Sequence, residues 1–198
     1  MHLRMQQSNI NEWTAKQENR RRILISIKQP LTAKQVSKKT RINLDTCSYI
    51  LGRFVSKGLS VCLNPEARSS RLYWLTDLGR ACRERLHQEL NLPEKAEKAY
   101  DLPSVNWELY GWVCFNHRAA VIRTMTVPMQ PSEVKRILRV HRPRMKISAN
   151  NIRDIVKLFL ARGIVRPVKI RKKAHLRYEL TEVGNQFRQL LMRAEAGF

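Results

Sequence analysis

The chain lacks the sequence features that mark metal centres, membrane segments and secretion. Its four cysteines, Cys47, Cys62, Cys82 and Cys114, are widely spaced, form no Cys-x-x-Cys pair and make no zinc-ligand pattern with histidine. No stretch approaches the roughly 18 consecutive apolar residues that cross a bilayer, and neither a signal-peptide run nor a lipidation motif is present. We therefore expect a cytoplasmic protein with reduced cysteines, no metal, no cofactor and no membrane attachment.

Sequence patterns of catalysis are also missing. There is no phosphate-cradling glycine loop, no pair of carboxylates in an apolar setting and no Ser-His or Cys-His constellation. His117, His141 and His175 lie in basic stretches, which suit phosphate contact better than proton transfer. We expect no enzymatic activity and find no evident small-molecule substrate.

Acidic residues are scarce. The 198 residues include 38 Lys plus Arg against 16 Asp plus Glu, a formal net charge of +22, while the hydrophobic content of 43% is ordinary for a globular protein. Such an excess favours a polyanionic partner through Coulomb attraction and counterion release. Anionic lipid would call for a basic amphipathic helix or a lipid anchor. Nucleic acid is therefore the expected partner, and we expect the cytoplasmic protein to be associated with the nucleoid.

One pattern occurs twice, in residues 44–86 and, 105 positions later, in 149–191. In the first copy the shared positions are Ile50, Leu51, Phe54, Lys57, Gly58, Leu59, Tyr73, Leu75, Thr76, Asp77, Leu78 and Gly79. In the second copy they are Ile155, Val156, Phe159, Arg162, Gly163, Ile164, Tyr178, Leu180, Thr181, Glu182, Val183 and Gly184. A repeat of this kind means that one structural unit is used twice. We predict two domains, 1–90 and 106–198, joined by a connector over 91–105.

Apolar spacing and turn residues predict the same order of elements in both copies. The first copy should contain a helix over 9–28 ended by Pro30, a helix over 33–40 capped by Thr32, a helix over 44–57 closed by Gly58, strands over 60–63 and 71–75, and a helix over 77–90 capped by Thr76. The helix over 44–57 should bury Cys47, Ile50, Leu51, Phe54 and Val55.

The second copy should follow the same order with one enlargement. We expect a helix over 107–125 with Trp112, Phe115, Val121, Ile122 and Met125 at apolar positions, a helix over 133–140 capped by Ser132, a helix over 149–162 capped by Ser148, strands over 164–169 and 176–180, and a helix over 182–194. Because the offset is 98 at Val36 and Val134 but 105 further on, seven extra residues must fall within 136–148.

Two phrases carry a family resemblance. Lys57-Gly58-Leu59 after the third helix, and Tyr73-x-Leu75-Thr76-x-x-Gly79 after the hairpin, resemble the MarR/PadR/ArsR-like winged helix-turn-helix proteins, over 10–90 and again over 106–193. The resemblance implies a mainly α fold with small β-hairpin wings, an α+β protein made of two tandem winged helix-turn-helix domains. It also implies sequence-specific binding of double-stranded DNA.

A winged helix presents its third helix to the major groove and its hairpin to the backbone or minor groove. The candidate contacts on the third helices are Thr46, Ser48, Tyr49, Arg53, Asn150, Asn151, Arg153 and Lys157. The candidates on the wings and the basic turn are Arg68, Arg71, Arg139, Arg142, Arg144, Lys146, Lys169, Arg171, Lys172, Lys173, His175 and Arg177. The alternative for each is a merely solvated polar position.

The second copy has the stronger signal. Residues 135–177 hold fifteen of the 38 Lys and Arg and one carboxylate, Asp154. Self-repulsion at that density is costly without a polyanion, and asparagine and arginine can bond adenine and guanine bidentately. We expect this copy to supply most of the non-specific affinity, and both copies to supply specificity.

The predicted role is a transcriptional regulator, a repressor or autoregulator, that uses two winged helices in one chain. A homodimer through the terminal helices is left open. Three alternatives remain: a plasmid or mobile-element replication initiator, a non-specific nucleoid-type or RNA-binding protein, and a protein–protein scaffold. Direct repeats at an origin would favour the initiator, and a site over a promoter would favour the regulator.

Overall fold

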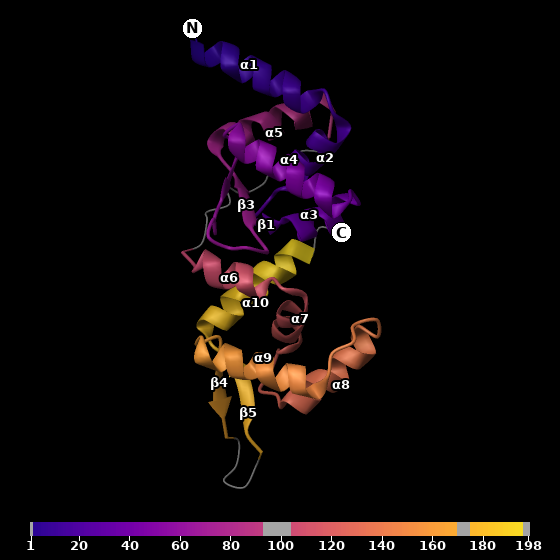
Figure 1. Cartoon of the computed structure of the whole chain (residues 1–198), viewed down its shortest axis with the longest axis vertical. Coiled ribbons are helices and arrows are strands. Elements are labelled where there is room, and N and C mark those ends of the chain that lie inside the picture. The colour runs from indigo at the N-terminus through magenta and orange to yellow at the C-terminus, as the bar shows by residue number, and fades with distance from the viewer. Residues whose placement is uncertain (1, 93–103, 170–174, 196–198) are drawn as a thin grey trace. The chain divides into compact units, whose positions relative to one another are not determined.

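The computed structural model describes residues 2–92, 104–169 and 175–195. It is mainly helical, with one antiparallel sheet of three strands and one of two (Figure 1). Internal contacts divide the chain into unit 1, Met1–Trp112, and unit 2, Val113–Ala196. The domain limits derived from the repeat, 1–90 and 106–198, stay predictions.

Unit 1 contains most of the elements that the first copy predicts. In chain order its elements are α1 (His2–Ala15), α2 (Glu18–Ser26), β1 (Leu31–Thr32), α3 (Ala33–Thr40), α4 (Leu44–Ser56), β2 (Ser60–Cys62), β3 (Leu72–Leu75) and α5 (Asp77–Glu89). Helix α6 (Trp107–Val113) crosses the limit between the units and falls where the second copy predicts its first helix. The strand order is β1-β3-β2. Thr32 and Thr76 cap α3 and α5 as predicted, because their hydroxyls accept the backbone N–H groups of Gln35 and Gly79.

The predicted helix over 9–28 is wrong, because the chain breaks between α1 and α2. Gln17 is extended, with φ −127° and ψ 123°. Arg20 donates from its guanidinium to the Trp13 carbonyl at 3.0 Å and stacks 4.0 Å from the Trp13 ring centroid. A side chain thus satisfies a carbonyl at the end of α1, where the apolar spacing predicts continued helix.

The predicted core stripe of α4 is confirmed at four positions. Cys47, Ile50, Leu51 and Phe54 are buried, whereas Val55 is 38% exposed. Each residue turns a helix by about 100°, so Val55 lies on the flank of the stripe that Phe54 continues. The prediction that Val55 belongs to the core is therefore wrong.

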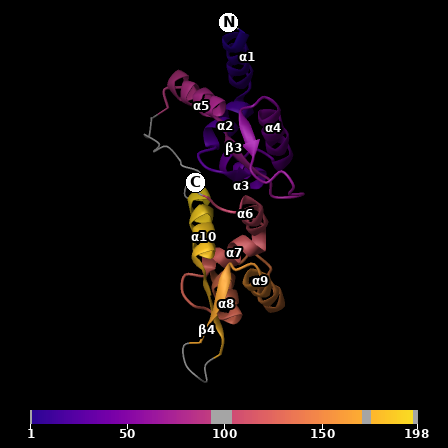
Figure 2. The ribbon, with the colours of Figure 1, turned by 90° about the vertical axis from the view of Figure 1, so that its left-hand side faces the viewer.

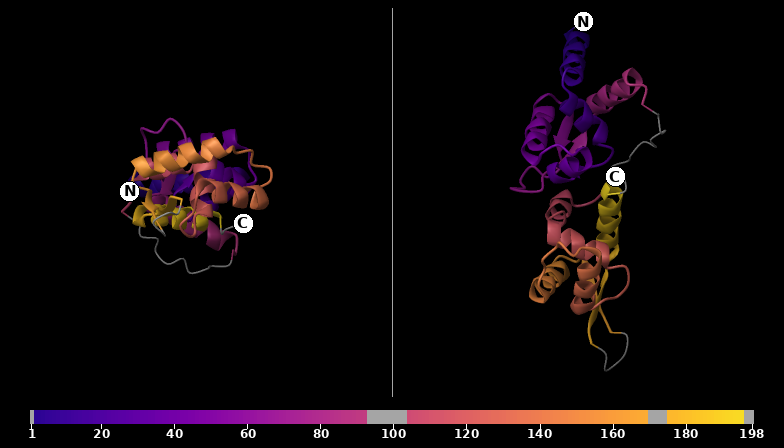
Figure 3. Two further views of the ribbon diagram at one scale, coloured as in Figure 1. Left: turned by 90° about the horizontal axis from the view of Figure 1, so that it is seen from below. Right: turned by 90° about the vertical axis from the view of Figure 1, so that its right-hand side faces the viewer.

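Unit 2 repeats the plan of unit 1. Its elements are α7 (Asn116–Thr124), α8 (Pro131–His141), α9 (Ala149–Ala161), β4 (Val165–Val168), β5 (Arg177–Leu180) and α10 (Glu182–Glu195). Figure 2 shows α10 beside α7, and the left view of Figure 3 shows α8 and α9 as neighbours. In place of β1, unit 2 has a single antiparallel bridge between Met129 and Tyr178, which matches the Leu31–Tyr73 pair of unit 1.

Two predictions for the second copy need correction. The helix over 107–125 is broken, because Phe115 is extended and precedes α7, and its ring is 54% exposed rather than in the core. The cap of α8 is Gln130 rather than Ser132. Pro131 occupies the first position of the helix, and the backbone N–H of Gln130 donates to Glu133 Oε2 at 2.8 Å.

The repeated sequence phrases build the same junction in each unit. Gly58 and Gly163 have φ +72° and +66°, which suits glycine, and end α4 and α9. The hydroxyl of Thr76 donates to the Gly58 carbonyl at 2.6 Å, and the hydroxyl of Thr181 donates to the Gly163 carbonyl at 2.6 Å. The hairpin therefore returns to the end of the preceding helix and is fixed there.

Glycine at the last position of the phrase permits a close helix approach. A Cβ on Gly79 would lie 2.0 Å from the Leu59 carbonyl oxygen, and one on Gly184 would lie 2.2 Å from that of Ile164. Neither distance is possible for a real side chain. The Gly of the Thr-x-x-Gly phrase is thus explained by packing within each unit.

The seven extra residues of the second copy lengthen α8 by three residues and the segment before the cap of α9 by four. Unit 1 has two residues, Arg41 and Ile42, between the end of α3 and the cap of α4 at Asn43. Unit 2 extends α8 to His141 and then runs irregularly to the cap of α9 at Ser148. The insertion predicted within 136–148 is confirmed.

Candidate nucleic-acid interface

Helix α9 has one buried and one polar face. It buries Ile152, Ile155, Val156 and Phe159. The polar face exposes Asn150, Asn151, Arg153, Asp154 and Lys157 to solvent. The Asn151 backbone N–H donates to Ser148 Oγ at 3.0 Å, so the first turn is capped as predicted. The predicted contacts on this helix therefore lie together on one accessible surface over its first two to three turns.

Two of these side chains are coupled. The Arg153 guanidinium donates to Asn150 Oδ1 at 3.0 Å. A bidentate contact from Asn150 to adenine needs that oxygen as an acceptor, so it would first have to break this bond. The Oδ1 atom of Asn150 is thus already engaged, and Arg153 is held beside it on the polar face of α9.

Helix α4 of unit 1 presents a different surface. Ser48, Tyr49 and Arg53 are exposed and Thr46 is half-buried, with Tyr49 68% exposed. Asn43, which the sequence pattern placed in a turn, caps the helix by accepting the Thr46 backbone N–H at 2.7 Å. The preference of asparagine for N-cap positions was the signal that could have identified it. This surface is more apolar and less cationic than that of α9.

The inserted turn carries accessible positive charge. Arg139, Arg144 and Lys146 are exposed, while Arg142 is half-buried and its guanidinium lies 3.4 Å from Glu195 Oε2. Val140, which no sequence motif marked, is 70% exposed at the same place. Arg139 lies in the last turn of α8, which packs against α9, and Arg144 and Lys146 lie in the segment that leads into the N-terminus of α9.

The predicted cationic hairpin tip of unit 2 is described only in part. Lys169 and His175 are exposed. Arg171, Lys172 and Lys173 lie outside the described residues. Arg177 is engaged within the unit: its guanidinium donates to the Pro128 carbonyl at 2.9 Å and pairs with Glu133 at 2.8 Å. Arg177 thus joins β5 to the start of α8 instead of projecting from the hairpin.

The hairpin of unit 1 is organised around Asn64. Its side chain is fully buried, accepts the Leu72 backbone N–H at 2.6 Å and donates to the Ser70 carbonyl at 3.2 Å. Arg71 donates from Nε to the Ala67 carbonyl at 3.0 Å, and Arg68 is exposed. Of the two arginines predicted here, Arg71 partly serves the hairpin itself and Arg68 points to solvent.

The two units differ in acids rather than in bases. Each contains 19 Lys plus Arg, but residues 1–112 contain 11 Asp plus Glu and residues 113–196 contain 5. Of those five, Glu133, Glu179 and Glu195 pair with arginines of unit 2 at 2.6–3.4 Å. Burial, and then the charge of Arg162, lower the pKa of Arg118. The remaining two carboxylates of unit 2, Asp154 and Glu182, are both exposed.

Metal clusters and membrane-spanning helices were looked for in the described ranges. Over residues 2–92, 104–169 and 175–195, no group of three His, Cys, Asp or Glu side chains could hold a metal ion. No helix in the part of the chain that the structure describes is long and apolar enough to span a membrane. Comparison of the chain with protein-family models, curated proteins and solved structures gave no match.

Proposed function

We propose that the protein binds double-stranded DNA through two winged helix-turn-helix domains and acts as a transcriptional regulator. The order of elements in each unit supports this proposal: helices α2, α3 and α4 followed by the β2–β3 hairpin, and α7, α8 and α9 followed by the β4–β5 hairpin. In this motif the third helix reads base edges and the hairpin contacts the backbone.

The observation that carries the proposal is the polar face of α9. It exposes Asn151, Arg153 and Lys157 next to the cationic turn formed by Arg139, Arg144 and Lys146. A surface that served only solubility would mix both signs of charge. Here the segment 135–177 carries fifteen Lys and Arg and a single carboxylate.

The proposed mechanism divides the work between groups. The turn and the hairpin of unit 2 bind phosphates, release counterions and fix the register of α9 in the major groove. Asn151 then reads adenine and Arg153 reads guanine. Unit 1 adds a second sub-site, where Ser48, Tyr49 and Arg53 on α4 face the DNA.

Selection from a randomised duplex pool tests the proposal. The full chain is incubated with the pool at about 150 mM salt, where purely electrostatic binding is weak. An extended motif with two sub-sites supports a sequence-specific protein, and its genomic position separates a regulator from a replication initiator. Recovery of no motif, with binding that disappears as salt rises, contradicts the proposal and favours a non-specific DNA- or RNA-binding protein.

Variants locate the interface. Arg153→Ala should lower affinity for the selected site and relax preference at one base pair, at about 1–3 kcal/mol for one bidentate pair of hydrogen bonds to a base. Arg193→Ala removes the same charge from an exposed position near the end of α10 and is the matched control. Equal losses of affinity in the two variants would contradict the proposal that α9 contacts the DNA.

A further inference from the structure

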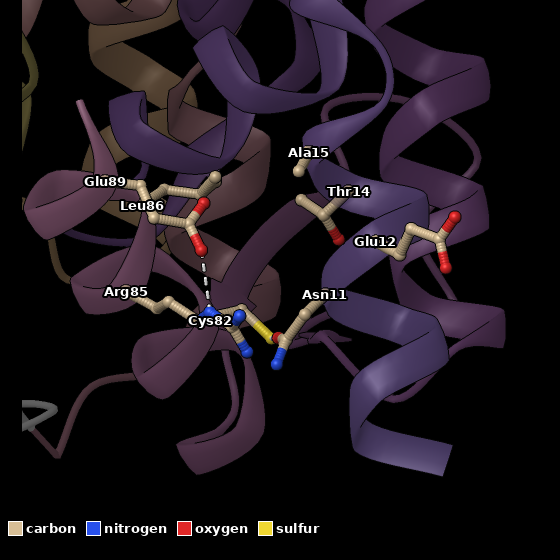
Figure 4. A pocket seen from close by; sticks show the side chains of 8 residues that line it. All are labelled: Asn11, Glu12, Thr14, Ala15, Cys82, Arg85, Leu86 and Glu89. Carbon is tan, nitrogen blue, oxygen red and sulfur yellow. Dashed lines mark hydrogen bonds and ion pairs between the residues drawn. The ribbon is translucent and has the colours of Figure 1, made fainter. Parts of the chain in front are cut away.

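A pocket of about 290 Å³ lies between α1 and α5 of unit 1. Figure 4 shows α1 on one side and α5 on the other, with side chains from both directed into the space between them. The lining residues are Asn11, Glu12, Thr14, Ala15, Cys82, Arg85, Leu86 and Glu89. A volume of this order accommodates a small organic molecule.

Groups of three chemical kinds meet in the pocket. The Arg85 guanidinium and the Glu89 carboxylate lie side by side, with Nε and Oε1 2.7 Å apart. Asn11 Oδ1 faces them across the pocket and accepts from the Cys82 thiol at 2.8 Å. Ala15 and Leu86 add an apolar wall (Figure 4). The pocket therefore offers a cation, an anion and an amide oxygen beside an apolar surface.

In unit 2 the corresponding face of α10 is apolar. The positions of α10 that match Cys82, Arg85, Leu86 and Glu89, 105 residues further on, are Phe187, Leu190, Leu191 and Ala194. All four are apolar and at most 4% exposed, and α10 packs against α7. This face can therefore be closed by ordinary core residues. In unit 1 it carries a thiol and an ion pair instead.

The ion pair contributes little to the fold. Arg85 and Glu89 are 58% and 45% exposed. They stand at i and i+4 with the cation first, which is the less favourable order on a helix. Half-exposed pairs of this kind are weak because water competes for both charges. Their charges can therefore turn to a ligand at small cost to unit 1.

We propose that this pocket binds a free α-amino acid. Its carboxylate would accept hydrogen bonds from the Arg85 guanidinium, and its ammonium would donate to the Glu89 carboxylate and to Asn11 Oδ1. Its side chain would lie against Leu86 and Ala15. A zwitterion matches the adjacent opposite charges, and an apolar side chain matches the wall. Binding of an amino acid here does not depend on the proposed binding of DNA.

Calorimetry on the full chain, with each of the twenty L-amino acids, tests the inference. We expect saturable binding of one or a few amino acids with an apolar side chain. The N-acetylated form of the best binder lacks the ammonium, and the corresponding amine lacks the carboxylate. Each should bind at least about tenfold more weakly, the usual loss for one charged hydrogen bond. No binding by any amino acid, or equal binding of these analogues, overturns the proposal.

Variants assign the two charges. Arg85→Gln should weaken binding of the amino acid but not of the amine, because the amine has no carboxylate. Glu89→Gln should weaken binding of the amino acid but not of its N-acetylated form, because that form has no ammonium. Glu84→Gln changes an exposed carboxylate of α5 that does not line the pocket, so it should bind like the unmodified protein. Melting curves without ligand check that the variants fold. Folded Arg85 and Glu89 variants with unchanged affinity would contradict the assignment.

Discussion

Alanine at Gly184 should destabilise unit 2 strongly, because the junction between the hairpin and α10 has no room for a methyl group. The added Cβ would lie 2.2 Å from the Ile164 carbonyl oxygen and 3.1 Å from Leu180 Cδ2. The oxygen belongs to the backbone, so relief requires α10 to move by about 1 Å. That movement stretches the bond from the Thr181 backbone N–H to the same oxygen, which is 3.0 Å long.

The magnitude follows from two contributions. Overpacking a well-packed site costs about 1–3 kcal/mol, and a weakened backbone hydrogen bond costs about 0.5–1.5 kcal/mol. The expected loss is therefore about 1.5–4.5 kcal/mol. Each kcal/mol lowers the melting temperature of a domain of 60–100 residues by about 4–8 °C. Gly79→Ala should act in the same way on unit 1, since its Cβ would lie 2.0 Å from the Leu59 oxygen.

The control is a glycine without this constraint. A Cβ on Gly52 would meet nothing within 4 Å, and Gly52 is exposed in the middle of α4. Gly52→Ala should therefore stabilise unit 1 by about 0.5–1 kcal/mol through helix propensity. Urea and thermal unfolding of the three variants measure these changes. If Gly184→Ala unfolds at the same midpoint as the unmodified protein, the proposed close approach of α10 is wrong.

Three further predictions concern charge and pH. Replacing Arg139, Arg144 and Lys146 together by alanine should make the slope of log K for DNA binding against log salt concentration shallower by about 0.9 for each phosphate that the variant no longer neutralises. Titration of a duplex at several salt concentrations measures this slope, and an unchanged slope would show that the inserted turn does not contact the DNA. Arg177→Ala should lower the free energy of unfolding by about 1–2 kcal/mol, because it leaves the half-buried Glu133 without its partner at 2.8 Å. Arg166→Ala breaks an ion pair whose arginine is 69% exposed, so it should lower the free energy of unfolding by about 0–1 kcal/mol. Denaturant unfolding compares the two variants, and equal losses would refute the idea that Arg177 braces β5 against α8. Burial raises the pKa of Cys47, Cys82 and Tyr73. These groups ionise less readily in the folded state, so their contribution to the free energy of unfolding is fully present below their ordinary pKa values and is lost as pH rises through the raised ones. Melting temperatures that stay constant from neutral pH to a pH of about 10.5 would contradict this.

Local chemistry made much of the fold predictable. Thr32, Thr76 and Ser148 cap helices because a hydroxyl just before an apolar run satisfies the N–H groups of the first turn. Gly58 ends α4 because it adopts a positive φ. Each of these signals involves residues only a few positions apart, so it can be recognised in the sequence without knowledge of the tertiary structure.

The failures come from contacts between distant residues or from side chains that compete with the backbone. At the break after α1 the Arg20 side chain bonds the Trp13 carbonyl, a contact that apolar spacing does not reveal. Arg177 pairs with Glu133, 44 positions earlier, so its basic neighbourhood suggested a hairpin-tip role that the structure does not give it. Tyr49 and Asn151 were correctly expected on exposed faces, because the opposite faces of α4 and α9 are apolar. Their contacts with DNA stay predictions.

The pocket of unit 1 has a signal in the sequence. Aligning the two copies places Arg85 opposite Leu190 and Glu89 opposite Ala194. A charged pair in one copy where the other has core residues indicates a changed environment, although it gives neither the hollow nor the partner helix. Repeats within one chain thus provide an internal reference that a single domain lacks.

The junction at Thr181 has a mechanical consequence. Its hydroxyl and backbone N–H bind the carbonyls of Gly163 and Ile164, so the end of α9 and the return of the hairpin are joined at one point. The C-terminal end of α9 and the base of the hairpin in unit 2 are therefore held at a fixed distance from each other. At this point the hairpin base cannot move away from the end of α9 unless these hydrogen bonds break. A force applied to the hairpin is transmitted directly to α9.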